Sequence, residues 1–163
     1  METITLHSTN NIDVSNTDSK PGIFNLFLCK CPRCRRGDMF QDKNPWHLKN
    51  TMKMNKECPV CGQPFELEVG FYYGTGYVSY ALTVAISVAT FIAFWVLYGI
   101  SIDDNSLYIW LVLNVIVLVL GLPYIMRLSR TMWLWFFVNY DPEWQSKEPP
   151  KPERIVEEHM GNW

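Results

Sequence analysis

The sequence predicts a membrane protein in which a small zinc-ribbon-like β module precedes an antiparallel two-helix transmembrane hairpin and a short interfacial helix. Three observations support this fold class. Four cysteines stand in two Cys-Pro-x-Cys motifs, at Cys31–Cys34 and Cys58–Cys61. No charged residue occurs from Val69 to Ile102, and none occurs from Asn105 to Met126. The formal net charge of −2 therefore averages polar ends with a nearly uncharged middle.

The charge pattern divides the chain into segments. We expect no secretory signal, because the start of the chain has neither a basic region nor an apolar core. The expected segments are a disordered leader over 1–22, a four-cysteine module over 23–69, an aromatic and glycine-rich membrane-entry segment over 70–78, transmembrane helices over 79–100 and 107–126, an interfacial helix over 131–140 and an acidic tail over 141–163.

The two cysteine motifs predict a metal site. Two thiolates from one Cys-x-x-Cys turn reach the same ion, and a second turn completes a tetrahedron. We therefore expect Cys31, Cys34, Cys58 and Cys61 to hold one structural Zn²⁺. A module of this size buries too little surface to fold without such help. Phe40 and Phe65 follow the two motifs as candidate core residues.

Other uses of the cysteines stay open. A rubredoxin-type iron site has similar turns, so iron is the alternative metal. Disulfides and a redox dithiol are less favoured, because the basic excess between Ile23 and Lys56 suits a reducing cytoplasmic face and no βαβ pattern surrounds either motif. Cys29 is left over; we interpret it as a buried thiol rather than a fifth ligand, and His47 as a surface residue.

The two uncharged stretches have the length of membrane spans. The first, over 76–100, would reach about 37 Å as a helix, and the second, over 107–126, about 30 Å. The short connection between them makes the helices antiparallel. Basic residues flank the module end of both helices, so the positive-inside rule predicts both termini in the cytoplasm, with Asp103–Ser106 outside.

The spans contain no ionisable side chain, and Asn114 is their most polar mid-span residue. Ion and proton routes usually carry such groups, so we do not expect a transporter or pump. We expect Asn114 to form a helix–helix hydrogen bond. Small residues on the first helix and aromatic residues after the second offer contact surface for other proteins. The interaction candidates are Ala85, Ala89, Asn114, Trp133 and Trp135.

Three sequence strings occur in a specific order before the hairpin: C-P-R-C-R-R-G-D-M-F from Cys31, C-P-V-C-G-Q-P-F from Cys58 and G-F-Y-Y-G-T-G-Y-V-S-Y from Gly70. This order resembles the bacterial family known as domain of unknown function 983, over roughly Lys30 to Asn139. The resemblance implies a small inner-membrane protein with a cytoplasmic zinc-ribbon-like module and two spans. It implies no established enzymatic reaction.

Genes of that family lie, in some bacteria, among those for cytochrome c oxidase and its assembly. The resemblance therefore implies an accessory or assembly role in respiratory complexes. Many relatives have glycine where this chain has Arg35, so the type of turn after the first motif stays open.

Three function classes follow from these features. The first is a non-enzymatic interaction or assembly protein of a larger membrane complex. The second is a thiol- or metal-handling membrane protein that uses Cys29 beside the four-cysteine site. The third is binding of anions through basic residues, where contact with the membrane surface is favoured over nucleic acid because no base-stacking platform is visible. These basic residues are Lys30, Arg33, Arg35, Arg36, Lys49, Lys53 and Lys56.

Overall fold

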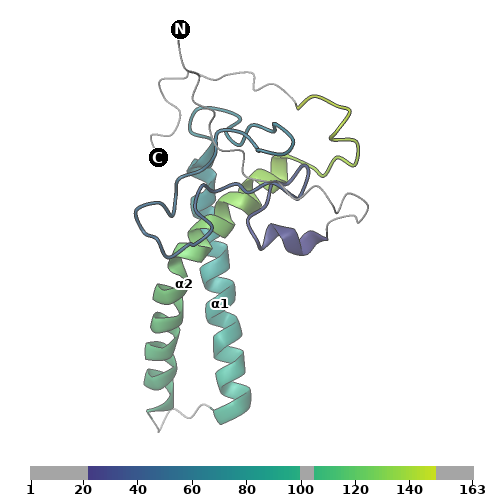
Figure 1. Ribbon diagram of the computed structural model, residues 1–163. Coiled ribbons are helices and arrows are strands. Elements are labelled where there is room, and N and C mark those ends of the chain that lie inside the picture. Colours follow the sequence, from purple (N-terminus) through teal and green to yellow (C-terminus); the bar gives the residue numbers. More distant parts are fainter. Residues whose placement is uncertain (1–21, 100–104, 150–163) are drawn as a thin grey trace.

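The computed structural model describes residues 22–99 and 105–149. Two long helices form an antiparallel hairpin beneath a loop-rich head (Figure 1). The elements are the 3-10 helices η1 (Ile23–Leu26) and η2 (Phe71–Gly74), then α1 (Thr75–Tyr98) and α2 (Ser106–Phe137). Nearly all of the predicted leader, most of the turn between the spans and the last part of the predicted tail lie outside the described residues.

Helix α1 begins earlier than predicted. Its first residue is Thr75, directly after η2, so most of the predicted entry segment is helical. Its 24 residues give about 36 Å of helix. The helix ends at Tyr98, and the next residue, Gly99, has a φ of 75°, a conformation that glycine adopts without strain. Both α1 and α2 are long and apolar enough to cross a membrane.

Polar side chains join the two helices at mid-span. Asn114 Nδ2 on α2 donates a hydrogen bond to Ser87 Oγ on α1 at 3.2 Å, and Thr90 Oγ1 donates to Asn114 Oδ1 at 3.1 Å. The rings of Phe91 and Trp110 meet edge to face nearby. Asn114 therefore forms the predicted helix–helix hydrogen bond, and its partners lie within this chain.

Helix α2 runs without interruption for 32 residues, so the prediction of a separate interfacial helix over 131–140 is wrong. Pro123 lies inside the helix, where it removes one hydrogen bond without ending it. Figure 1 shows α2 changing direction at the base of the head, as a helix with an internal proline can. The last turns then pass under the head, where Leu128 and Leu134 are buried. These contacts hold the segment against the head.

The predicted β module is not supported, because the described residues contain no β-strand. The head has only three isolated bridges, which join Lys30 to Asp38, Phe40 to Met54, and Glu57 to Pro64. Phe40 and Phe65 are buried as predicted, but no sheet lies between them. The head instead packs its short loops on the cysteines and on α2. Cysteine side chains and Leu134 of α2 belong to the same buried cluster as Phe40 and Phe65.

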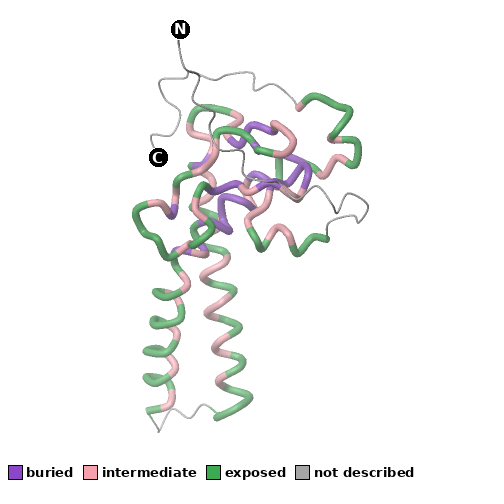
Figure 2. The backbone as a smooth tube through the Cα atoms, viewed as in Figure 1, coloured by how far each residue is buried: buried purple, intermediate pink, exposed green. Residues whose placement is uncertain are grey.

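One hydrophobic core unites the head with the hairpin. Figure 2 shows the buried residues concentrated in the head and around the part of α2 beneath it. The cluster contains Cys31, Cys34, Met39, Phe40, Cys58, Phe65, Leu134 and Val138. Leu134 is the α2 residue in this list, and Val138 immediately follows the helix. The head is therefore built on α2, and it is not a separately folded module on a tether.

Candidate metal centre

The four cysteines of the two motifs converge in the head. Their Sγ atoms all lie within 4.8 Å of one another and could hold a metal ion. The Sγ atoms of Cys31 and Cys61 are 3.7 Å apart, as are those of Cys34 and Cys58. A tetrahedral zinc site with Zn–S bonds of about 2.3 Å places its sulfurs about 3.8 Å apart. The spacing and chemistry of these donors therefore fit a four-thiolate centre.

Both cysteine turns have the same backbone geometry. The N–H of Arg35 donates to the carbonyl of Cys31 at 2.7 Å, and the N–H of Gly62 donates to the carbonyl of Cys58 at 2.9 Å. Arg35 has a φ of 56° and Gly62 a φ of 68°. The first turn, whose type the sequence left open, is therefore of the same type as the second. The arginine adopts the left-handed conformation itself, which costs a non-glycine residue about 1 kcal/mol.

Gly37 lets the first loop approach the second motif. A Cβ atom at this position would lie 2.3 Å from Cys58 Sγ, closer than atoms can approach. The carbonyl of Gly37 also accepts a hydrogen bond from the N–H of Cys31 at 2.8 Å. The sequence signal was the glycine after the first motif, which is displaced by two positions relative to Gly62. Glycine at position 37 allows the backbone of the first loop to approach the Cys58 sulfur closely.

The crowded sulfurs have strongly perturbed proton affinities. Hydrogen bonding with Cys31, and to a lesser extent with Cys58, lowers the pKa of the Cys34 thiol. Hydrogen bonding with Cys34 raises the pKa of the Cys31 thiol. Four thiols this close cannot all ionise with no positive charge among them. A divalent cation removes that conflict and favours the thiolate form of every ligand.

The segment that follows α2 covers the first motif. The guanidinium of Arg33, which is 3% exposed, donates to the carbonyl of Lys147 at 2.6 Å and lies 3.4 Å from the carboxylate of Asp141. The N–H of Asp141 returns a hydrogen bond to the carbonyl of Arg33 at 3.2 Å. The described part of the predicted acidic tail, over 141–149, is therefore bound to the head.

Two more basic residues of this motif also contact that segment. The Arg35 guanidinium lies 4.6 Å from the ring centre of Tyr140, and that of Arg36 lies 5.9 Å from the ring of Trp144. Such contacts stabilise a cation against an aromatic face. The basic surface expected from the sequence is therefore divided: Arg33, Arg35 and Arg36 contact residues of this chain. Lys30 forms an ion pair with Asp38, and Lys49, Lys53 and Lys56 line a cavity of the head.

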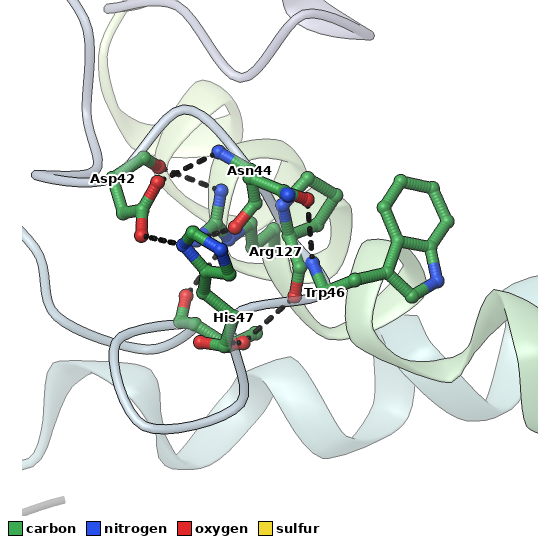
Figure 3. Close-up of polar contacts among 7 residues, drawn as sticks. Asp42, Asn44, Trp46, His47 and Arg127 are labelled. Carbon is green, nitrogen blue, oxygen red and sulfur yellow. Dashed lines mark hydrogen bonds and ion pairs between the residues drawn. The ribbon is translucent and has the colours of Figure 1, made fainter.

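Arg127 fastens the head to α2. Its three guanidinium nitrogens donate to the backbone carbonyls of Thr51 at 2.8 Å, Asp42 at 2.8 Å and Asn44 at 3.1 Å (Figure 3). The guanidinium also stacks over the Phe40 ring at 4.8 Å. In the sequence, Arg127 indicated only that this end of the second span is cytoplasmic. The carbonyls that it bonds lie more than 75 positions away, so no local pattern shows this role.

The loop held by Arg127 is also braced from within. The carboxylate of Asp42 accepts a hydrogen bond from the N–H of Asn44 and lies 2.7 Å from the His47 ring (Figure 3). These two contacts, with the backbone N–H first, lower the pKa of the Asp42 carboxyl. His47 is on the surface, as predicted, and lies outside the sulfur cluster.

Cys29 does not belong to the four-sulfur cluster. Its thiol is partly buried beside the core, and its φ is 55°. Burial raises the pKa of the Cys29 thiol, while contact with Thr131 opposes that shift. The group is therefore a poorer nucleophile at neutral pH than an exposed thiol.

The chain matches one family of proteins over residues 48–137, described as Protein of unknown function (DUF983). This range covers more than half of the 163 residues. The chain belongs to this family. Neither the curated proteins nor the solved structures contain a match. The matched range includes Cys58, Cys61 and both long helices, and it ends with the last residue of α2.

The remaining interaction candidates fall into two groups. Ala85 and Ala89 are exposed on α1. Trp133 is engaged within the chain, because its indole N–H donates to the Phe71 carbonyl at 2.7 Å and a Cβ on Gly74 would overlap its ring. Trp135 is half-buried and lines a small crevice beside the first cysteine motif.

Proposed function

We propose that the protein is a non-enzymatic accessory or assembly protein of a bacterial inner membrane. In this proposal a structural Zn²⁺ held by the four cysteines orders a cytoplasmic head, and the hairpin fixes that head at the membrane surface. Both termini lie in the cytoplasm. The partner is a larger membrane complex, and the family resemblance suggests a respiratory one related to cytochrome c oxidase.

The observation that carries the proposal is the shared core of the head and α2. Cys31, Cys58 and Leu134 belong to one buried cluster, so metal binding, head and helix form one rigid unit. Four cysteine ligands leave no open coordination position of the kind that catalytic zinc keeps. Such a unit is suited to presenting a surface in a defined orientation.

The outer face of α1 is the proposed contact with the partner. Ala85 and Ala89 are exposed there, one helical turn apart, and small residues allow close approach of another helix. Asn114 and Trp133 make their contacts within the chain, so the α1 face replaces them as the main candidate surface. Ser87 and Thr90 face α2, which leaves the alanines on a different side of α1.

The alternative of thiol or metal handling through Cys29 has less support. Its sulfur lies outside the cluster, and burial raises its pKa. Both features disfavour exchange with a bound ion.

The test of the assembly role is purification from native membranes in mild detergent, with crosslinking in cells. The wild type should migrate in a large assembly, and the double variant Ala85→Phe/Ala89→Phe should migrate alone. The matched control is Val112→Phe/Val119→Phe, which enlarges two exposed apolar residues on α2. Migration of the wild type alone, with no crosslinked partner, would refute the assembly role.

A further inference from the structure

A cavity of about 440 Å³ lies between the head and α2, and none of the four clustered cysteines belongs to its lining. Four basic side chains and one acid belong to its lining: Lys49, Lys53, Lys56, Arg130 and Glu66. This difference, four minus one, gives the lining a formal charge of +3. Leu48, Met52 and Phe65 add apolar surface to the same lining. The cavity thus combines a positive charge with an apolar wall.

Arg130 is the buried cation of this cavity. Its side chain lies over the Tyr72 ring at 5.2 Å, and the residue is 8% exposed. Its Nη1 makes only long contacts, 3.4 Å to the Met52 carbonyl and 3.5 Å to the Met54 sulfur. Among the described residues its buried Nε has no hydrogen-bond partner.

Arg127, one turn earlier on α2, differs from Arg130 in the hydrogen bonds that its guanidinium makes. Arg127 directs all three nitrogens to backbone carbonyls at 2.8 to 3.1 Å. Arg130 is also buried, but the described chain gives its Nε no acceptor and its Nη1 only long contacts, while the carboxylate of Glu66 is a nearby opposite charge. A buried guanidinium nitrogen without an acceptor is costly, and an anion with several oxygens would satisfy it. Phosphate matches the planar fork of arginine in particular.

The level of the cavity suggests the source of that phosphate. The indole N–H of Trp46 donates to the Leu120 carbonyl at 3.2 Å, so the loop carrying Leu48 and Lys49 touches α2 beside its apolar part. Arg130 lies ten residues farther along α2, about 15 Å of helix. Because α2 bends at the base of the head (Figure 1), this length is an upper limit on the difference in height between the two residues. The headgroup layer of one leaflet, about 5 to 7 Å thick, is thinner than that limit. Tryptophan favours this interface.

We propose that this cavity binds the phosphate headgroup of an anionic membrane phospholipid. Arg130 contacts the phosphate, Lys49, Lys53 and Lys56 supply the surrounding positive charge, and Leu48 and Met52 contact the lipid beyond the headgroup. The proposal rests on the membrane location of the proposed function. The proposed lipid is a second ligand, distinct from the metal ion of the four-cysteine site.

The test uses the full-length protein in lipid nanodiscs of phosphatidylcholine, with or without phosphatidylglycerol. After mild detergent release, native mass spectrometry counts phosphatidylglycerol molecules retained by the protein. We expect retention by the wild type and about five-fold weaker retention in Lys53→Gln and in Lys56→Gln, because a lysine near a lipid surface contributes roughly that factor. Lys43→Gln is the matched control, an exposed lysine of the head outside this cavity.

Three outcomes would overturn the proposal. The first is an equal loss in Lys43→Gln and Lys53→Gln, which would assign retention to general surface charge. The second is a thermal shift with inorganic phosphate in lipid-free detergent equal to that with phosphatidylglycerol, which would assign the cavity to a soluble anion. The third is wild-type retention no greater than that of Arg130→Gln, with zinc content used to show that the variant folds.

Failure of this proposal is distinguishable from failure of the proposed function. Alkaline extraction of cell membranes tests insertion alone. A protein that resists extraction, yet binds phosphatidylglycerol without dependence on Lys53, remains a membrane protein that lacks this lipid site. A protein released by the extraction contradicts the membrane location itself.

Discussion

Arg35 and Gly62 occupy equivalent positions one residue beyond the two cysteine motifs, and both adopt a left-handed backbone, with φ of 56° and 68°. Each N–H bonds to the carbonyl of the first cysteine of its own motif. The turn that presents a pair of thiols therefore requires this conformation whichever residue supplies it. In the first motif the arginine is held there by contacts on both sides. The Asn25 side chain donates to its carbonyl at 2.8 Å, and its guanidinium lies on Tyr140.

This relationship predicts that two substitutions at Arg35 differ in their effect on stability. Arg35→Gly should leave the free energy of unfolding within about 1 kcal/mol of the wild type, because relief of backbone strain offsets the lost contact with Tyr140. Arg35→Val should lower it by about 2 kcal/mol, since a β-branched residue tolerates positive φ poorly. Thermal unfolding of the zinc-loaded protein measures both. Equal stability of the two variants would contradict the role given to the turn.

The metal centre predicts one Zn²⁺ per chain in protein purified without chelators. Cys58→Ser should lose the metal and unfold the head, because metal binding at a site formed only in the folded state contributes directly to folding. Cys29→Ser is the matched control and should keep full zinc content, since Cys29 lies outside the cluster. Elemental analysis checks both. Iron in place of zinc, or loss of metal in Cys29→Ser, would require a different centre.

Gly37 predicts a steric requirement beside the metal. A methyl group there would meet Cys58 Sγ at 2.3 Å, so Gly37→Ala should weaken zinc binding about ten-fold or more in competition with a chelator. Gly76→Ala is the control, because a Cβ at that position meets no atom within 4 Å. That control should be neutral or slightly stabilising, as alanine favours helix over glycine. Unchanged zinc affinity in Gly37→Ala would contradict the close approach.

The Arg127 anchor predicts that its charge and shape both matter. Arg127→Gln should lower the free energy of unfolding by about 3 kcal/mol, because it removes charge-assisted hydrogen bonds to three buried or partly buried carbonyls. Arg127→Lys should recover only part of this loss, since one ammonium cannot match the spacing of the guanidinium fork. Limited proteolysis of the 41–51 loop measures the detachment. Wild-type protection in Arg127→Gln would show that other contacts hold the loop.

The orientation of the hairpin predicts which residues react from outside the cell. A cysteine at Asn105, in a Cys29→Ser background, should react with an impermeant thiol reagent in intact cells. This residue is exposed and begins α2 at the end of the hairpin away from the head (Figure 1). A cysteine at Gln145, in the segment that covers the head, should react only after the membrane is permeabilised. The reverse pattern would place the head outside.

Features that depend on local chemistry and on segment length could be predicted from the amino-acid sequence. Two Cys-x-x-Cys turns specify a four-sulfur cluster because the geometry of each turn is local, and the structure brings all four sulfurs together. Two uncharged stretches specify two long helices because apolar length alone sets that requirement. The contact of Asn114 with the other helix could also be predicted, because a polar side chain among apolar residues needs a nearby hydrogen-bond partner.

The way in which these parts combine depends on contacts between residues far apart in the chain. The sequence suggested a sheet beneath the cysteines and a separate helix after Arg130, but α2 continues through this region and supplies Leu134 to the core of the head. The partners of Arg33 and Arg127 lie far along the chain, so charge patterning identified the arginines without showing what they hold. Arg130 was one more positive charge in the sequence. Its unsatisfied burial beside three lysines exists only because α2 passes under the head, and packing between distant segments leaves no periodic signal in a single sequence.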